Sequence, residues 1–235
     1  MNSRPQTRHS VLAFTLIELL TVITIIAILM GLLFPAIGIV KDSARKAEAK
    51  AAVAQIAASV KQYYTEYGKY PVADYVTGTP SDIKLGDQSK SGAVDSNADL
   101  FNILRGRNVG RNVDNLYNPR RMSFFEHKPV GDPTAPKSGF LDSAGSGSLG
   151  AFYDPWGRQY TIVIDANYND VINISGTYGD FSEQSQEGGD TGVRVGVGVF
   201  SLGKDGEIGS PNASPPVTGR YRQGSNISDD ILSWQ

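Results

Sequence analysis

Residues 14–40 read FTLIELLTVITIIAILMGLLFPAIGIV, and this run decides how the chain is organised. Its only charged side chain is Glu18, near its start. As a helix the run would be about 40 Å long, which exceeds the roughly 30 Å thickness of a bilayer core. It is too long for the apolar core of a cleaved secretory signal, and no A-x-A site closes it. We therefore predict a membrane-spanning helix over residues 14–40.

Pro35 lies inside this run, between Gly31 and Gly38. Proline lacks the N–H that a helix needs, and its ring clashes with the carbonyl four residues back. We therefore predict a kink at Pro35. Neighbouring helices can compensate for such a break inside a membrane. The run is thus either a kinked anchor or a helix that packs against copies of itself.

The composition excludes several kinds of site. The chain has 235 residues, 22 basic and 24 acidic side chains and a net charge of −2, so its overall charge does not favour nucleic-acid binding. It has no cysteine, which excludes disulfides and thiol chemistry. The two histidines, His9 and His127, exclude a histidine-rich zinc site, and any Ser-His-Asp centre would need one of them.

The helical pattern continues through residues 41–71. The stretch KDSARKAEAKAAVAQIAASVKQYYTEYG is rich in residues that favour helices. Apolar side chains recur every three or four residues along one face: Ala52, Ile56, Val60, Tyr63 and Tyr67. Gly68 and Pro71 then end the helix. We predict one helix from about Phe14 to Tyr67, whose amphipathic second half packs on a folded domain and buries its tyrosines in the core.

Residues 72–150 give weaker signals. GTPSDIKLGDQSKSGAVDSNA, residues 78–98, is predicted to be loop because turn-forming residues occur throughout. A short helix is predicted from Ala98, capped by Asp95, Ser96 or Asn97. A local cluster of basic residues follows: Arg105, Arg107, Arg111, Arg120 and Arg121. No aromatic residues are interleaved with this cluster, so we predict a solvated face rather than a nucleic-acid surface.

Two strands are predicted in the carboxyl-terminal part of the chain. In the first, Tyr160, Ile162 and Ile164 alternate with their neighbours at the period of a strand. Valines line one side of the second: Val193, Val195, Val197 and Val199. We predict an α+β fold in which the long helix packs on a small antiparallel β-sheet and a loop-rich carboxyl-terminal region follows.

Carboxylates are concentrated in the turn-rich segment near the end of the chain: Asp205, Glu207, Asp229 and Asp230. Loop carboxylates and backbone carbonyls are the oxygens that Ca²⁺ prefers, so a calcium site and ordinary turn aspartates are both open interpretations. A separate stretch, DANYND from Asp165, has Asp170 and Gly176 where an EF-hand loop needs glycine and glutamate. We predict a β-turn between strands there.

The amino terminus resembles that of the type IV pilin and pseudopilin superfamily. The shared features are a short basic leader, a small residue, FTLIELL and a long apolar helix with proline near its twenty-second position. The resemblance implies that residues 1–13 are a leader, cut by prepilin peptidase between Ala13 and Phe14, and that the new amino group of Phe14 is methylated. Ala13 stands where the family usually has glycine, so we expect slower processing. Residues 72–235 would form a periplasmic globular domain with a pilin-like fold.

The carboxyl-terminal half is similar to the major pseudopilin of type II secretion systems, through YDPWG, SLGKDG and a final DDILSW. The resemblance implies a Ca²⁺ site formed by Asp205, Asp229, Asp230 and the carbonyl of Leu202, with Ser228 as a further candidate. This chain departs from the family in having 23 residues, including three prolines, in the segment 206–228, where the family's loop is short.

The resemblance implies a structural subunit and no enzyme. The subunit would sit in the inner membrane as a single-pass protein, with its amino terminus in the cytoplasm, and would polymerise through its first helix. Glu18 of one subunit would pair with the amine of Phe14 in a neighbour. The implied partners are other pseudopilins, prepilin peptidase, the inner-membrane assembly platform and the lipid bilayer, with no nucleic acid.

Two alternatives remain open. One is a type IV pilin of an adhesion, motility or DNA-uptake system. The other is a membrane-anchored periplasmic enzyme or binding module, for which Trp156 and Trp234 would matter if they were exposed. We find no nucleophile, base and orienting residue in a recognisable set.

Overall fold

The computed structural model describes residues 15–72, 82–86, 96–174, 192–210, 217–218, 221–223 and 226–235. The predicted leader and the cleavage site at Ala13 and Phe14 lie outside these residues. The contacts divide the chain into two units, which meet between Ala44 and Arg45.

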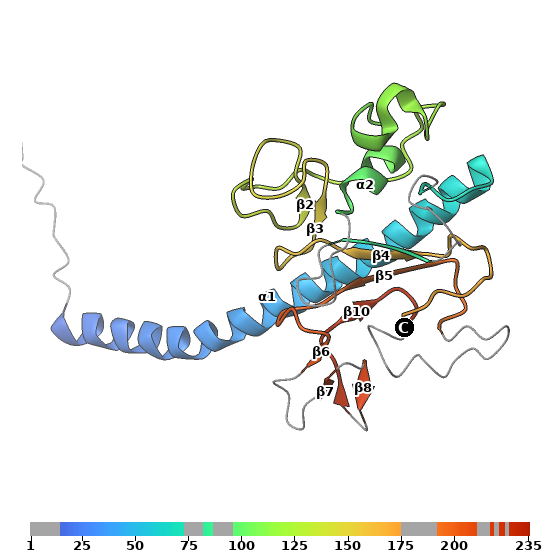
Figure 1. The fold of residues 1–235 in the computed structure, drawn as a ribbon. Helices are drawn as coiled ribbons and strands as arrows, with labels where there is room; N and C mark the ends of the chain where they lie inside the picture. The colour runs from blue at the N-terminus through green and yellow to red at the C-terminus, as the bar shows by residue number, and fades with distance from the viewer. Residues whose placement is uncertain are drawn as a thin grey trace, which may run out of the picture. The chain divides into compact units, whose positions relative to one another are not determined.

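One long helix, α1, runs from Leu16 to Tyr67 (Figure 1). By length and composition it is able to span a membrane, and none of its most apolar window is buried within the protein. The helix is continuous through Pro35, and the kink at this residue stays a prediction. The apolar first half therefore offers an uncovered surface, which suits lipid or neighbouring helices.

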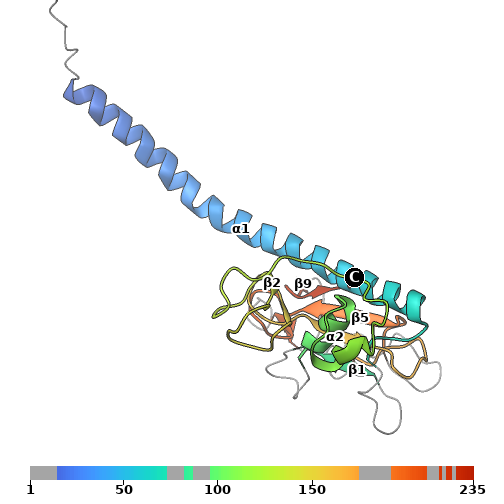
Figure 2. The same cartoon turned by 90° about the horizontal axis from the view of Figure 1, so that it is seen from above.

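The second half of α1 buries one face against the folded domain. Ala52, Ile56, Val60 and Tyr63 are at most 4% exposed and belong to the main core, and Tyr67 is partly buried beside them. Figure 2 shows this half of the helix lying along the β-sheet. The predicted apolar stripe is therefore confirmed.

A four-stranded antiparallel sheet forms the centre of the domain, in the order β1-β4-β5-β10. Its strands are β1 (Ile83–Leu85), β4 (Thr161–Ile164), β5 (Val197–Ser201) and β10 (Ile231–Leu232). Leu85 pairs with Ile162, Ile162 with Val199, and Ser201 with Ile231. The predicted α+β fold, with a long helix on a small antiparallel sheet, is confirmed.

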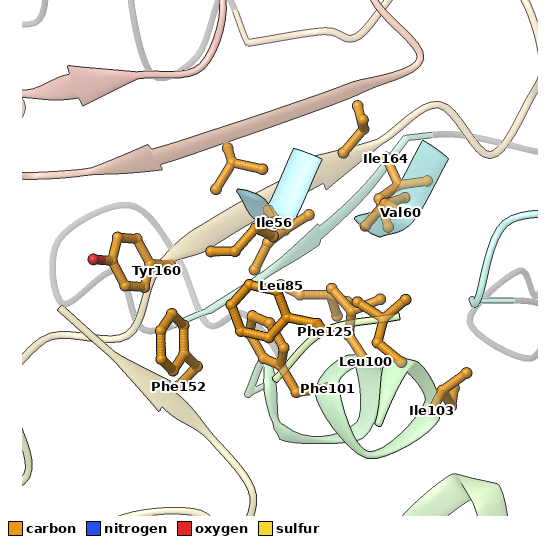
Figure 3. Packing of buried hydrophobic residues seen from close by; sticks show 14 of the residues in the cluster. Ile56, Val60, Leu85, Leu100, Phe101, Ile103, Phe125, Phe152, Tyr160 and Ile164 are labelled. Atoms are coloured by element: carbon orange, nitrogen blue, oxygen red, sulfur yellow. The ribbon is translucent and has the colours of Figure 1, made fainter. Parts of the chain in front are cut away.

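Both faces of the sheet are covered, so β4 and β5 are buried throughout. Ile162 and Ile164 face the core that α1 covers, whereas Val163 and Phe200 belong to a second cluster with Ile172. In Figure 3, Ile56 of α1 lies near Leu85 and Val60 lies near Ile164, while Phe101 and Phe125 lie beside Leu85.

The sequence prediction was wrong for two edge strands and too long for one central strand. Ile83–Leu85 lies in a stretch predicted to be loop, and Ile231–Leu232 lies at the end of a segment that we also read as loop. Strand β5 begins only at Val197, while Val193 makes an isolated bridge to Ile172. These segments are short, and pairing with a neighbouring strand decides their structure.

The remaining elements are short. They are helix α2 (Ala98–Leu104), the 3₁₀ helix η2 (Gly110–Asn115) and strands β2 (Gly139–Phe140), β3 (Phe152–Tyr153), β6 (Gly209–Ser210), β7 (Val217–Thr218), β8 (Arg222–Gln223) and β9 (Asn226–Ile227). Strands β6 and β7 pair with each other, as do β8 and β9. The long segment 206–228 therefore carries two small antiparallel ribbons beside the main sheet.

Asn97 stands at the amino end of α2, as predicted, but its side chain makes no capping hydrogen bond. Its Nδ2 instead donates to the carbonyls of Phe152 and Tyr160, and its Oδ1 accepts the N–H of Phe152. The amide of Ala98 donates to Ser96 Oγ at 3.2 Å. The predicted capping function thus falls to Ser96, and Asn97 joins α2 to β3.

Four of the five clustered arginines are ion-paired rather than simply solvated. Arg105 and Arg107 both contact Asp142, and two further pairs complete the set: Arg111 with Asp99 and Arg120 with Glu66. Because four of the five charges have a carboxylate partner within the chain, the cluster is not an open basic surface for nucleic acid.

Candidate functional site

Thr15 and Glu18 form a capping box at the start of α1. The N–H and Oγ1 of Thr15 donate to Glu18 Oε2 at 2.8 and 2.6 Å, and the N–H of Glu18 donates to Thr15 Oγ1 at 3.3 Å. The T-x-x-E spacing is a known helix-start signal. The sequence contained this signal, but we had read Glu18 only as a charge awaiting a partner in another subunit.

Other polar groups in this stretch are also satisfied within the helix. Thr21 Oγ1 donates to the carbonyl of Ile17 at 3.0 Å, and Thr24 Oγ1 donates to that of Leu20 at 2.8 Å. Large apolar side chains surround them on every side, and Leu16 is 82% exposed. The only ionisable side chain of residues 16–40 is therefore Glu18, held by its own first turn in a surface that is otherwise apolar.

At the other end of the chain, Asp205 and Asp229 meet at a tight turn over residues 203–206. Asp229 Oδ2 accepts the N–H groups of Lys204 at 2.8 Å and Asp205 at 3.4 Å. Asp205 Oδ1 accepts the N–H of Glu207 at 2.9 Å. Gly203 and Gly206 both have positive φ, so the turn needs glycine at these two positions.

Burial, together with the nearby Asp229 carboxylate, raises the pKa of Asp205 above its ordinary value. Two carboxylates that approach each other disfavour their own ionised forms unless a cation or proton lies between them. Such a pair suits a hard divalent cation, provided that backbone carbonyls or water complete the six to eight oxygens that Ca²⁺ needs.

The other three predicted ligands are placed differently. Asp230 Oδ2 accepts the N–H of Gly209 at 2.8 Å, and Ser228 Oγ accepts the N–H of Asp230 at 3.3 Å. Leu202 is buried immediately before the turn. In the part of the chain that the structure describes, no three acidic or histidine side chains gather closely enough to hold a metal. The structure therefore brings together Asp205 and Asp229, while Asp230 holds the start of β6.

The YDPWG stretch forms a turn around a buried carboxylate. Asp154 is fully buried, and its Oδ1 accepts the N–H groups of Trp156, Gly157 and Arg158 at 2.8–2.9 Å. Its Oδ2 accepts the hydroxyl of Ser201 at 2.7 Å. Burial raises the pKa of Asp154, and these hydrogen bonds oppose that rise. Sequence reasoning used YDPWG as a point of resemblance and assigned no function to Asp154.

Two further sequence predictions can be compared with the structure. In DANYND, the Asp165 carboxylate accepts the N–H groups of Asn169 and Asp170, which closes a turn at the place where one was predicted. Trp156 and Trp234 are each partly buried and pack against a hydrophobic cluster. They do not form the exposed aromatic platform that a carbohydrate-binding module would use.

Comparison with known proteins bears on the amino terminus. Residues 8–34 match the family described as "Prokaryotic N-terminal methylation motif". The chain carries a prepilin-type signal. This signal supports the type IV pilin and pseudopilin superfamily, and with it processing by prepilin peptidase and assembly with other pilin-like subunits. No curated protein and no solved structure matches the chain.

Proposed function

We propose that the chain is a structural subunit of a type II secretion pseudopilus. Prepilin peptidase processes it between Ala13 and Phe14, and it polymerises through α1 to drive folded proteins across the outer membrane. The observation that carries this proposal is the position of Glu18. It is the one charge in residues 16–40, the uncovered apolar half of α1, and it lies within the matched prepilin-type signal.

In this proposal Glu18 sets the register between subunits. Cleavage leaves a positive amine on Phe14, four residues before Glu18, so each subunit carries one charge of each sign at its amino end. A buried charge that lacks its partner is strongly destabilising. Neighbouring helices therefore favour the one axial offset at which the carboxylate of one subunit meets the amine of the next.

The carboxyl-terminal features support a secretion system over another type of pilus. SLGKDG and DDILSW resemble the corresponding parts of the major pseudopilin, and Asp205 and Asp229 from these two stretches lie together at one turn. We extend the proposal to one Ca²⁺ ion at this turn. Asp205 and Asp229 would hold it, with the Leu202 carbonyl completing part of its coordination, and the ion would neutralise the two carboxylates. The subunit would lie in the inner membrane with its domain in the periplasm.

The test is a gene deletion in the source organism, complemented with wild type, Glu18→Leu or Glu126→Gln. Glu126 is an exposed carboxylate of the folded domain, so its variant is a matched control. We expect the deletion to trap normally exported proteins in the periplasm and wild type to restore export. Glu18→Leu should restore neither export nor sheared filaments, although it reaches the membrane in normal amounts.

Two results would contradict the proposal. If the Glu18→Leu variant assembled normal filaments, Glu18 would not be required for assembly. A deletion that abolishes adhesion, motility or DNA uptake but leaves export intact would assign the subunit to a different pilus.

A further inference from the structure

Three tyrosines form an aromatic cluster on the surface of the folded domain, which we call the tyrosine patch: Tyr64, Tyr70 and Tyr168. The ring centroid of Tyr70 lies 4.7 Å from that of Tyr64 and 5.5 Å from that of Tyr168, on which it stacks at an interplanar angle of 23°. Tyr168 is 52% exposed and Tyr64 is 39% exposed. Within the described part of residues 45–235, no other phenylalanine, tyrosine or tryptophan ring is exposed.

Two carboxylates lie close to the tyrosine patch. Asp165 is buried and its carboxylate accepts the N–H groups of Asn169 and Asp170, whereas Asp170 itself is exposed. Burial, and after it the nearby Asp165 carboxylate, raises the pKa of Tyr70 to about 12, and Asp170 acts in the same direction. The faces of tyrosine rings are also negative, so rings and carboxylates together attract a cation. A guanidinium fits best, because it is planar and stacks on aromatic faces.

The backbone conformation sets Tyr168 and one arginine apart. Positive φ occurs at six non-glycine positions among the described residues: Asp114, Asn115, Arg121, Ser138, Tyr168 and Asp170. Four of these residues have short polar side chains, whereas Arg121 (φ 54°) and Tyr168 (φ 59°) have long ones, and both side chains are exposed. A strained backbone costs free energy, and such strain is concentrated at functional sites. It therefore directs attention to what these two exposed side chains could bind.

Arg121 stands on a firmly held turn and has an available guanidinium. Its N–H donates to the carbonyl of Asn118 at 2.9 Å. A Cβ at Gly106 would lie 3.0 Å from the carbonyl carbon and oxygen of Arg121, so the backbone of Arg121 packs directly on this glycine. The other four arginines of its cluster are ion-paired, but no ion pair involves Arg121 within the described residues.

Arg121 and the tyrosine patch lie on different sides of α1. The residue before Arg121, Arg120, forms an ion pair with Glu66 of α1. Glu66 follows Tyr64 by two residues, which places it about 200° away around the helix. One molecule therefore presents a cation on one side and an aromatic, acidic surface on another.

We propose that the guanidinium of Arg121 in one copy of the chain stacks on the tyrosine patch of the next copy. This inference rests on the proposed filament, although not on its use in secretion. Two different surfaces that are complementary and face different ways join copies head to tail, as an open filament requires. Arginine and tyrosine are also residue types that are enriched at the centres of protein interfaces.

The test is cysteine crosslinking in the deletion strain of the source organism, because the chain has no cysteine of its own. Two single-cysteine chains, Tyr168→Cys and Arg121→Cys, are produced together and treated with a short bismaleimide. Each chain carries one thiol, so a crosslink always joins two copies. We expect crosslinked dimers in the mixture and few with either chain alone. Asp132→Cys, which is exposed in a separate loop, should give none in place of Arg121→Cys.

Tyr64→Cys provides a second partner in case Tyr168→Cys does not fold, since Tyr64 lies in α1 rather than in a strained loop. Mixed with Arg121→Cys, it should also give dimers. The yield of sheared filaments is a second measurement. Arg121→Ala should lower it about two- to fivefold, which corresponds to an exposed cation–π pair. Lys137→Ala, which removes another exposed cation, should leave it unchanged.

Two results would contradict different parts of this scheme. If the mixtures form filaments without crosslinked dimers, the inference is overturned and the proposed function stands. If the wild-type chain forms no filaments, the proposed function is overturned, and the inference with it.

Discussion

At the scale of single residues, Glu18 has a partner before it meets another subunit. The capping box with Thr15 satisfies the carboxylate and the first amides of α1 within one chain. In our proposal, Glu18 therefore exchanges Thr15 for the amine of a neighbouring subunit during assembly. The free energy gained is the difference between these two pairings of Glu18, and it is smaller than the full cost of an unpaired carboxylate in lipid.

The first prediction concerns the Thr15 hydroxyl. Thr15→Val removes the acceptor of the Glu18 N–H and one donor to its carboxylate, so the first turn of α1 should fray. In detergent micelles we expect the Glu18 amide to exchange its proton faster by NMR than in wild type. Thr24→Val, which removes a hydroxyl bonded within the same helix, should leave exchange at Glu18 unchanged. Unchanged exchange in Thr15→Val would show that the hydroxyl does not hold the turn.

The second prediction concerns Asp142, which holds Arg105 and Arg107. The hydrogen bond from Arg105 lowers the pKa of Asp142. A lowered carboxyl pKa stabilises the fold above the pKa of the unfolded chain, and this contribution is lost as the pH falls through the folded value. Asp142→Asn should therefore cost about 1 kcal/mol at pH 7, because the group is partly exposed and screened, and the difference from wild type should shrink towards pH 3.

Thermal melting of both proteins at several pH values measures this effect. Glu126→Gln, which alters an exposed carboxylate on the same segment of the domain, should melt like wild type at each pH. A difference between Asp142→Asn and wild type that persists undiminished at pH 3 would show that the pair does not act through the charge of the carboxylate.

Among the elements, the second half of α1 covers one face of the sheet and contributes its apolar stripe to the main core. Its stripe belongs to the same hydrophobic cluster as β1, β4 and β5, and Ile56 is fully buried there. Ser59 adds a polar link, because its Oγ donates to the carbonyl of Phe124 across the interface. The helix therefore belongs to the folding unit 45–235 as well as to the membrane-length segment.

The third prediction tests this contribution to the core. Ile56→Ala should destabilise the domain by 2–5 kcal/mol, roughly the range measured for large-to-small substitutions in cores. Gln62→Ala, at an exposed position of the same helix, should change stability by less than about 0.5 kcal/mol. Chemical denaturation of the full chain in detergent compares the two. Equal stabilities would mean that α1 does not contribute to the core.

The fourth prediction concerns calcium and the turn at residues 203–206. At a Ca²⁺ concentration of 100 times its Kd, binding should stabilise the native chain by about 2.7 kcal/mol, and chelator should remove this gain. Asp205→Asn and Asp229→Asn should abolish the response, whereas Asp132→Asn, in a separate loop, should keep it. Melting temperatures with and without CaCl₂ measure it. A wild-type melting temperature that chelator does not change would contradict calcium binding.

The sequence predicted this helix well because its signal is local. Ile56 and Val60 lie one turn apart on a long periodic face, and the period itself specifies what is buried. Strands β1 and β10 have only three and two residues, and they exist because β4 and β5 lie beside them. Asn97 is a single-residue example of what local sequence cannot predict. Its side chain is drawn away from capping by hydrogen bonds to residues more than 50 positions away.

The candidate sites show the same contrast between local sequence signals and contacts between distant residues. The T-x-x-E spacing and the apolar run around Glu18 can be read from neighbouring residues alone. The meeting of Asp205 and Asp229 was expected only through resemblance, because 23 residues separate them in the chain. The hydrogen bond from Ser201 to Asp154 has no sequence pattern at all, since it depends on the β3–β4 turn packing against the end of β5.

At the scale of the whole molecule, the chain separates two tasks. Residues 16–40 expose an apolar surface with one carboxylate, while residues 45–235 contain a buried core and the carboxyl-terminal turn. The two parts share α1 but have few physical requirements in common. Changes at Glu18 should therefore leave the domain unaffected, and changes in the domain core should leave membrane insertion unaffected.

The fifth prediction follows from this separation. Glu18→Leu should melt within about 1 °C of wild type in detergent and appear in the membrane fraction at the same level, because a surface substitution far from a core changes stability little. Ile56→Ala should show the opposite result, with a lowered melting temperature and normal membrane insertion. A large loss of domain stability in Glu18→Leu would show that the two parts are energetically coupled.

The uncovered apolar surface of α1 also determines where subunits are located before they assemble. Exposing such a surface to water costs about 25 cal/mol for each Å², so a subunit cannot leave lipid until other helices take its place. In our proposal the filament therefore grows from subunits held in the plane of the membrane. Each apolar helix passes directly from lipid into the filament and is never exposed to water. Its growth rate should follow the number of subunits per area of membrane, and protein dissolved in the periplasm should contribute nothing to it.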